Sequence, residues 1–187
     1  MKELFKVNTR VIVATGLGAA IFTLLFMFVK VPSPIQGTSF QTAYGLGAFF
    51  AVLFGPVAGG LIAFIGHALS DAVQYGAPWW SWVISSGIAG TVFGFACGKT
   101  KVEEGECKMK DIVIFNLYQA IGHCIAFLVC APVLDIVIYA EPVNLVFTQG
   151  MMAAFANIVS TAVIGTFLLT AYAATRTKKG SLEKGDE

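Results

Sequence analysis

Residues Phe64–Val83 read FIGHALSDAVQYGAPWWSWV and place two ionisable side chains inside an apolar segment. His67 and Asp71 are four residues apart, so they share one face of a helix. An ionised Asp at the centre of a membrane helix costs about 2.5–3.5 kcal/mol on insertion scales, so such a residue indicates a functional site by default. A hydrogen bond that only packs two helices together is the alternative, and residue types alone favour neither.

The whole chain has the composition of a membrane protein. Of its 187 residues, 57% are hydrophobic and only 12% are charged. A soluble domain has about 25% charged residues. The composition predicts an all-α protein of six transmembrane helices, because each span needs about 20 apolar residues. We expect a single transmembrane domain over residues 1–175 and a charged cytoplasmic tail over 176–187. Without a basic stripe, no nucleic-acid partner is expected.

Breaks in the apolar pattern predict where the spans begin and end. Gly55 and Pro56 separate a short second span from the third, because proline suits the first turn of a helix. Pro132 is expected to break the fifth span, after which residues 133–139 continue as an interfacial or kinked piece. Residues 30–39 are Pro-rich and are expected to form a loop that could fold over a site. The predicted spans are 9–29, 41–54, 57–74, 79–97, 111–131 and 145–174.

The basic residues predict the orientation in the membrane. With six spans, 11 of the 12 Lys and Arg residues fall on one side, and only Lys30 falls on the other. Basic residues are enriched in cytoplasmic loops, so both termini and the 99–110 loop are predicted to be cytoplasmic. The tryptophans at 79, 80 and 82 then lie at the outer surface.

Polar side chains recur along the expected spans, for example as a stripe at Asn116, Gln119 and His123. Polar groups in lipid must face protein or water, so they are expected to point into the bundle. Indole faces and amides suit a planar heterocycle, although an interfacial aromatic belt would explain the same tryptophans. No cluster among them demands a charged substrate. The candidate substrate-binding residues are Gln41, Tyr44, His67, Asp71, Gln74, Trp79, Trp82, Gln119, His123, Gln149 and Asn157.

No metal or nucleotide site is expected. The four cysteines form no CxxC pair and no HExxH-like ligand set is present, so we expect no metal, no cofactor and no disulfide framework. Residues 94–100 read GFACGKT and approach a phosphate-binding loop, but Phe93 stands where that motif needs a glycine. The chain is therefore not expected to hydrolyse ATP.

Composition and topology leave three functions open. The chain could be a substrate-capturing membrane subunit, an autonomous transporter coupled to protons through Asp71, or an intramembrane enzyme using His67, Asp71 and His123. An enzyme would be favoured by a denser set of metal ligands, and none is seen. An autonomous transporter would be favoured by internal repeats, and none is evident.

Several motifs together resemble the S components of energy-coupling factor (ECF) transporters. They are a small-residue first span, PSPI at 32–35, and FGPVAGGLIAFIGHALSDAVQYGAPWWSWVISSGIAG at 54–90, in a six-span frame. The resemblance implies a non-catalytic bacterial cell-membrane protein that binds a vitamin or vitamin precursor near its outer face. The loops between spans 1–2, 3–4 and 5–6 would form the site. Hydroxymethylpyrimidine, a thiamine precursor, is the substrate that the aromatic and amide groups favour.

The resemblance also implies partners. ECF S components dock onto a membrane scaffold subunit (the T component) that is driven by two ATP-binding subunits, and toppling within the membrane is thought to release the substrate inward. Docking uses small residues of the first span, which let two helices approach closely in lipid. In this chain the resemblance assigns docking to Ala14, Gly16, Gly18 and Ala20. Packing of these residues against the chain's own helices is the alternative.

Overall fold

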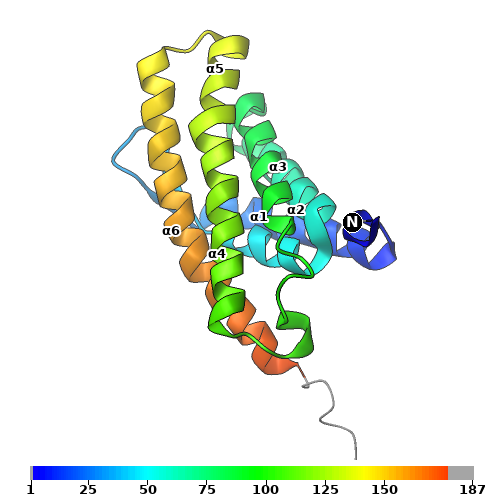
Figure 1. The fold of residues 1–187 in the computed structure, drawn as a ribbon. Helices are drawn as coiled ribbons and strands as arrows, with labels where there is room; N and C mark the ends of the chain where they lie inside the picture. The colour runs from blue at the N-terminus through cyan, green and yellow to red at the C-terminus, as the bar shows by residue number, and fades with distance from the viewer. Residues whose placement is uncertain (1, 177–187) are drawn as a thin grey trace, which may run out of the picture.

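The computed structural model describes residues 2–176, which fold almost entirely into helices (Figure 1). The predicted tail, apart from Arg176, lies outside the described residues. A hairpin of two short strands follows the first helix, where the sequence predicted only a loop. The α-helices are α1 (Thr9–Phe28), α2 (Ala43–Tyr75), α3 (Trp80–Gly94), α4 (Met109–His123), α5 (Ala131–Tyr139) and α6 (Val143–Thr175). The other elements are the 3-10 turns η1 (Lys2–Phe5) and η2 (Val102–Glu104), the π-helical segment η3 (Cys124–Cys130), and the strands β1 (Lys30–Pro32) and β2 (Ser39–Gln41).

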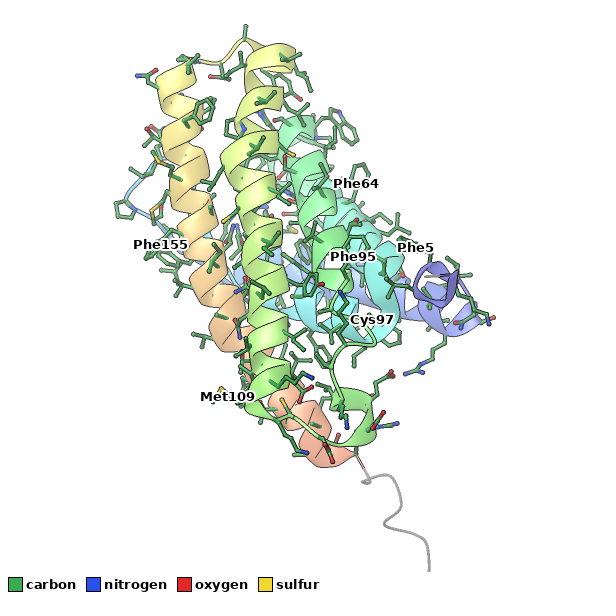
Figure 2. All side chains as sticks on the ribbon, in the orientation of Figure 1. Phe5, Phe64, Phe95, Cys97, Met109 and Phe155 are labelled. Carbon is green, nitrogen blue, oxygen red and sulfur yellow. The ribbon has the colours of Figure 1, made fainter. Side chains whose placement is uncertain are left out.

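Four stretches of helix are long and apolar enough to cross a membrane: Thr9–Phe28, Ala43–Tyr75, Met109–Tyr139 and Val143–Thr175. Their outer faces carry large apolar side chains that no other part of residues 2–176 covers. Phe155 points away from the bundle in Figure 2 and is 61% exposed. Such a surface is stable in hydrocarbon and not in water, so the chain is a helical membrane protein.

Helix α2 changes direction at Gly55, as the sequence predicted. Gly55 has φ 88° and ψ 179°, a conformation that residues with a side chain rarely adopt. A Cβ at this position would also lie 2.8 Å from the carbonyl oxygen of Leu4. Pro56 follows and begins the second helical segment of α2. The prediction that residues before and after Gly55 and Pro56 form separate helices is therefore confirmed.

The second segment of α2 packs against α3 with almost no side chain between the two backbones. A Cβ on Gly90 would lie 2.1 Å from the carbonyl oxygen of Gly59, and one on Gly60 would lie 2.3 Å from the hydroxyl of Thr91. Small residues permit this approach, which replaces the hydrophobic effect as a source of helix association in lipid. These contacts join the start of the second segment of α2 to the C-terminal half of α3.

Helices α4 and α5 join through η3 into one column (Figure 1). The predicted break at Pro132 is therefore wrong. The N–H of Ala131 donates to the carbonyl of Ala126, five residues earlier. The hydrogen bonds have therefore already shifted from the α-helical to the π-helical spacing before Pro132, the second residue of α5. A π-helical turn of this kind accommodates the missing N–H of proline within a continuing helix.

The ends of the elements gather at two opposite ends of the molecule. At one end, Arg10 of α1 forms a 3.1 Å ion pair with Glu103 of η2, and the Nε of Arg176 donates to the Glu103 carbonyl over 3.4 Å. At the other end, the hairpin contacts α2 and α6: Lys30 Nζ donates to Gln74 Oε1, and Gln149 Nε2 donates to the carbonyl of Gln36, each over 3.1 Å. We call these the charged end and the hairpin end.

Candidate substrate-binding site

A cavity of about 930 Å³ opens at the hairpin end of the molecule. The hairpin, the C-terminal part of α2, the start of α3, the π-helical segment with α5, and the first half of α6 supply its walls. Eight of the eleven candidate residues from the sequence line it, although they come from four separate parts of the chain. They are Gln41, Tyr44, His67, Asp71, Trp79, Trp82, Gln149 and Asn157.

A chain of polar side chains crosses one wall of the cavity. Asp71 Oδ1 lies 3.5 Å from Nε2 of His67, and Nδ1 of His67 lies 2.7 Å from the Ser86 hydroxyl. The hydroxyls of Ser86 and Tyr44 share a 2.7 Å hydrogen bond. All four side chains are buried, so each depends on the next to satisfy its polar atoms in an apolar interior. Ser86, which sequence reasoning missed, is the link between α3 and the other two segments.

The carboxylate of Asp135 in α5 accepts three hydrogen bonds from side chains in the cavity wall. Its Oδ1 accepts from the indole N–H of Trp79 over 2.7 Å and from the Ser81 hydroxyl, and its Oδ2 accepts from the indole N–H of Trp82 over 2.7 Å. Asp71 adds a second anchor, because its Oδ2 accepts from the backbone N–H of Trp79 over 3.0 Å. Two carboxylates thus fix the tryptophan-rich start of α3.

Aromatic rings form much of the remaining surface. The rings of Trp82 and Phe127 lie 5.6 Å apart at 30°, and Tyr44 meets Phe127 edge-on at 5.7 Å. Trp79 stacks on Tyr139 of α5 at 4.3 Å. Phe127 belongs to the π-helical segment, whose extra residue per turn sets the direction of its side chain. The wall therefore offers flat apolar faces beside polar groups, which is what a ring-containing ligand needs.

The hairpin lines the cavity, and hydrogen bonds within residues 33–38 hold its shape. The Thr38 hydroxyl donates to the carbonyl of Ile35 over 2.7 Å, and the Ser33 hydroxyl accepts from the N–H of Ile35 over 3.1 Å. Gly37 has φ 79°, and a Cβ there would lie 3.0 Å from Nε2 of Gln149. The expected folding of the 30–39 loop over a site corresponds to this arrangement.

Three candidate residues do not line the cavity. Gln74 lies at its edge, where its Oε1 accepts from Lys30 and its Nε2 donates to the Ser70 hydroxyl over 2.7 Å. Gln119 Nε2 donates to the carbonyl of Ile158 over 3.3 Å, and His123 Nε2 lies 3.0 Å from the Thr161 hydroxyl. Gln119 and His123 therefore bond α4 to α6, because the face of α4 that carries them is covered by α6.

The cavity also contains charged groups that the sequence reading did not single out. Lys30, Asp135 and Glu141 line it together with Asp71. The carboxylates of Asp71 and Asp135 already accept hydrogen bonds from the protein. Lys30 is bound to Gln74 at the edge. Asp71, Asp135 and Lys30 thus have partners within the protein and do not by themselves define a charged ligand.

Comparison with known proteins decides the family. The family described as "ECF-type riboflavin transporter, S component" matches this chain over residues 6–174. The chain belongs to this family. The resemblance to ECF S components is confirmed, and the chain is accordingly a membrane transport subunit. S components of ECF transporters in general work with a T component and ATPases.

Curated relatives cover this S component over nearly its whole length. A UPF0397 protein of an Exiguobacterium strain is 53% identical over 177 residues, which is 95% of this chain and 97% of the relative. A UPF0397 protein of Enterococcus faecalis is 51% identical over 184 residues, 98% of this chain and 100% of the relative. A UPF0397 protein of Streptococcus gordonii is 47% identical over 186 residues, which is 98% of this chain and 100% of the relative.

The small residues of α1 in this S component point in two directions. Gly16 and Ala20 are exposed, and a Cβ on Gly16 would meet no atom within 4 Å. Ala14 and Gly18 are buried, and a Cβ on Gly18 would lie 2.6 Å from Cδ1 of Ile62. Within residues 2–176, Ala14 and Gly18 thus pack on the chain itself, while Gly16 and Ala20 form an open small-residue surface.

The residues that sequence reasoning missed carried a readable signal in one case. Asp135 lies in the apolar run VLDIV, and an ionisable residue in such a run is a candidate for function on the same grounds as Asp71. The interpretation of residues 133–139 as an interfacial or kinked piece removed that signal. Ser86 carried no comparable signal, because serine is common in membrane helices and its partners are distant in sequence. No group of three or more His, Cys, Asp or Glu side chains suited to a metal occurs in the described part of the chain.

Proposed function

We propose that this S component captures a vitamin-type molecule with a planar heteroaromatic ring at the extracellular side and delivers it inward when docked on an ATPase-driven scaffold. The observation that carries the proposal is the cavity at the hairpin end. Indole, phenol and phenyl faces line it together with amides from α6 and the hairpin. Membership of a transport-subunit family supports a binding role for this cavity.

The size of the cavity bears on the substrate. At about 930 Å³ it lies near the top of the range for drug-sized ligands, about 300–1,000 Å³. Hydroxymethylpyrimidine, the substrate that the sequence favours, is a single substituted ring and would fill only a small part. A vitamin with two or three rings fits better, and riboflavin, which the family description names, is of that kind. We therefore propose a multi-ring vitamin, with the free pyrimidine as the smaller candidate.

Ligand binding by the purified chain tests this proposal. The detergent-solubilised protein is titrated with riboflavin, thiamine and hydroxymethylpyrimidine, and mass spectrometry identifies any small molecule that it retains through purification. We expect one vitamin-type ring compound to bind at a one-to-one ratio. A protein that binds none of these compounds and retains no ring compound would exclude the proposed function.

We propose six membrane passes with both termini in the cytoplasm. Contacts at the charged end bring the start of α1, the 95–108 segment and the end of α6 together, which an even number of passes requires. The turn at Gly55 lets α2 supply two of the passes. Most basic residues among 2–176 belong to the segments that meet at the charged end, and basic residues favour the cytoplasm.

Thiol labelling in intact cells tests this orientation. Cys107 is partly exposed in the 95–108 segment, so a membrane-impermeant maleimide should label it only after the cells are opened. Cys97 is a built-in comparison, because burial and, to a lesser extent, Glu103 raise the pKa of its thiol. Only the thiolate reacts, so Cys97 should label more slowly than Cys107 at pH 7 and gain more from a higher pH. Labelling of Cys107 in unopened cells would reverse the orientation.

We propose that Gly16 and Ala20 form the surface of α1 that docks onto the scaffold. Gly16→Leu should abolish uptake in cells that contain the ATPase module and leave ligand binding by the isolated subunit unchanged. Gly18→Leu is the matched comparison and should lower stability, because Gly18 packs on Ile62. Normal uptake by the Gly16→Leu variant would refute the docking surface. Uptake without any ATPase module would instead favour an autonomous, proton-coupled transporter.

A further inference from the structure

The side-chain carbonyl oxygen of Gln41, in the cavity wall, has no hydrogen-bond partner among residues 2–176. Gln41 is the last residue of β2, and its backbone is fully engaged. Its N–H donates to Oδ1 of Asn157 over 3.2 Å, and its carbonyl accepts from the Ser160 hydroxyl over 2.9 Å. Its side chain lines the cavity and is 8% exposed, yet its Oε1 accepts no hydrogen bond from the described residues. A buried acceptor in this state costs free energy that a ligand donor would recover.

Asn157 provides the opposite hydrogen-bonding character beside it. An asparagine side chain can usually be turned either way round, but here the backbone N–H of Gln41 must face an oxygen. The Oδ1 of Asn157 is therefore committed, and its NH₂ group is the end left to donate. Asn157 lines the same cavity and is 3% exposed. The unpaired acceptor is thus Oε1 of Gln41 and the available donor is the NH₂ group of Asn157, and a hydrogen bond links the two residues.

The other polar groups of the wall are less available. The Asp135 carboxylate accepts three hydrogen bonds from side chains of the protein. Asp71 is held by His67 and by the Trp79 backbone. Among the buried polar side chains that line the cavity, the hydrogen-bonding capacity left for a ring edge is therefore that of Gln41 and Asn157.

We propose that Gln41 and Asn157 recognise a heterocycle edge on which an N–H donor stands next to an acceptor atom. A lactam has such an edge, with N–H beside C=O, and so does an aminopyrimidine, with NH₂ beside a ring nitrogen. Gln and Asn amides recognise the matching edge of adenine in DNA through the same complementarity. The last torsion of Gln41 is soft, so Oε1 can turn to meet the ligand N–H. The assignment rests on the proposed function and narrows its substrate class.

Two matched probe pairs test the assignment on the purified full-length chain. Riboflavin and 3-methylriboflavin differ at the lactam N–H, and hydroxymethylpyrimidine and its 4-dimethylamino derivative differ at the amino N–H. Each probe is titrated against the wild-type chain and against Gln41→Met, which keeps the side-chain length and removes the acceptor. Gln119→Met is the control, because Gln119 is a buried glutamine outside the cavity, where its Nε2 donates to the carbonyl of Ile158.

We expect the parent compound of at least one pair to bind the wild type about tenfold more tightly than its blocked partner, which is the loss of one hydrogen bond. Gln41→Met should remove that difference, and Gln119→Met should preserve it. A difference that survives in Gln41→Met, or that is absent from the wild type while the parents bind, overturns the assignment and leaves the proposed function standing. Failure of all four probes to bind the wild type overturns the assignment and counts against the proposed function as well.

Discussion

The two histidines of this chain lie on similar polar stripes and have different surroundings. The α2 stripe is His67, Asp71 and Gln74, and the α4 stripe is Asn116, Gln119 and His123. His67 shares a face of α2 with Asp71, lines the cavity, and contacts both Asp71 and Ser86. His123 shares a face of α4 with Gln119, is fully buried, and bonds to Thr161 of α6. In the sequence the two stripes are equivalent, since each places polar groups about one helical turn apart in an apolar run.

The difference between the two stripes comes from what lies opposite each one. Along the α4 stripe, α6 supplies a polar partner at each position, such as the Thr166 hydroxyl that accepts from Asn116 over 3.1 Å. His67 and Asp71 of the α2 stripe also contact α1 and α3, but they line the cavity, whose lining includes the hairpin. A polar stripe in a membrane helix therefore indicates an inward-facing surface, and the neighbouring element decides whether that surface binds a ligand or another helix.

Asp135→Ala should have the largest effect, because Asp135 holds the wall that faces the α2 stripe. The substitution leaves the indole N–H groups of Trp79 and Trp82 and the Ser81 hydroxyl without their acceptor. Each unpaired donor costs about 1–3 kcal/mol, so we expect a clear fall in melting temperature and a loss of affinity on the order of 100-fold. Asp135→Asn retains one acceptor oxygen, so its melting temperature and ligand affinity should lie between those of the wild type and of Asp135→Ala. Wild-type affinity in Asp135→Ala would show that the tryptophans keep their places without this carboxylate.

Replacing each histidine by phenylalanine tests the comparison directly. His67→Phe keeps the ring beside Phe26, which lies 4.3 Å away, but removes the hydrogen bonds to Ser86 and Asp71. We expect about a tenfold loss of ligand affinity, the value of one hydrogen bond. His123→Phe should leave affinity unchanged and reduce stability by about 0.6 kcal/mol, the average for such bonds between membrane helices. Titration and thermal unfolding measure the two quantities, and equal losses of affinity would remove the distinction between the stripes.

Gln74→Leu should have the smallest effect. Gln74 extends the α2 stripe but bonds to Lys30, so it touches the cavity only through the hairpin. We expect a two- to threefold change in affinity, carried mainly by faster ligand dissociation, because a partly exposed polar contact contributes about 0.2–1 kcal/mol. Stopped-flow dissociation rates measure it. A loss as large as that of His67→Phe would place Gln74 in contact with the ligand.

Most of the fold was predictable from hydropathy and from glycine and proline positions. The break at Gly55 followed from local chemistry, because only glycine adopts its φ of 88° without strain. The column from Met109 to Tyr139 was predicted with a break, because the tolerance of Pro132 depends on the π-helical turn before it. That turn carries no distinct pattern in the sequence, and neither do the short strands of the hairpin.

The sequence predicted the residue types of the candidate site better than it predicted which individual residues line the cavity. Eight of the eleven candidates line one cavity, since polar and aromatic residues near the outer ends of the predicted spans were placed at the same depth by the topology. Depth alone did not separate Gln119 and His123 from this group, because their partners on α6 are about 40 residues away in sequence. Ser86 was missed for the same reason, because its role depends on contacts between segments. Asp135 was missed because residues 133–139 were interpreted as an interfacial or kinked piece.

The sequence by itself determined that this protein is a helical membrane protein of the S-component family, because hydropathy, the Gly55 turn and the motifs of residues 54–90 are local properties of the chain. The tertiary structure decided which polar groups face the cavity and which small residues of α1 remain open. Those outcomes depend on the partner that each side chain meets across the bundle. In an apolar interior every polar group must find such a partner, and only the packed fold shows which groups have found one within the protein.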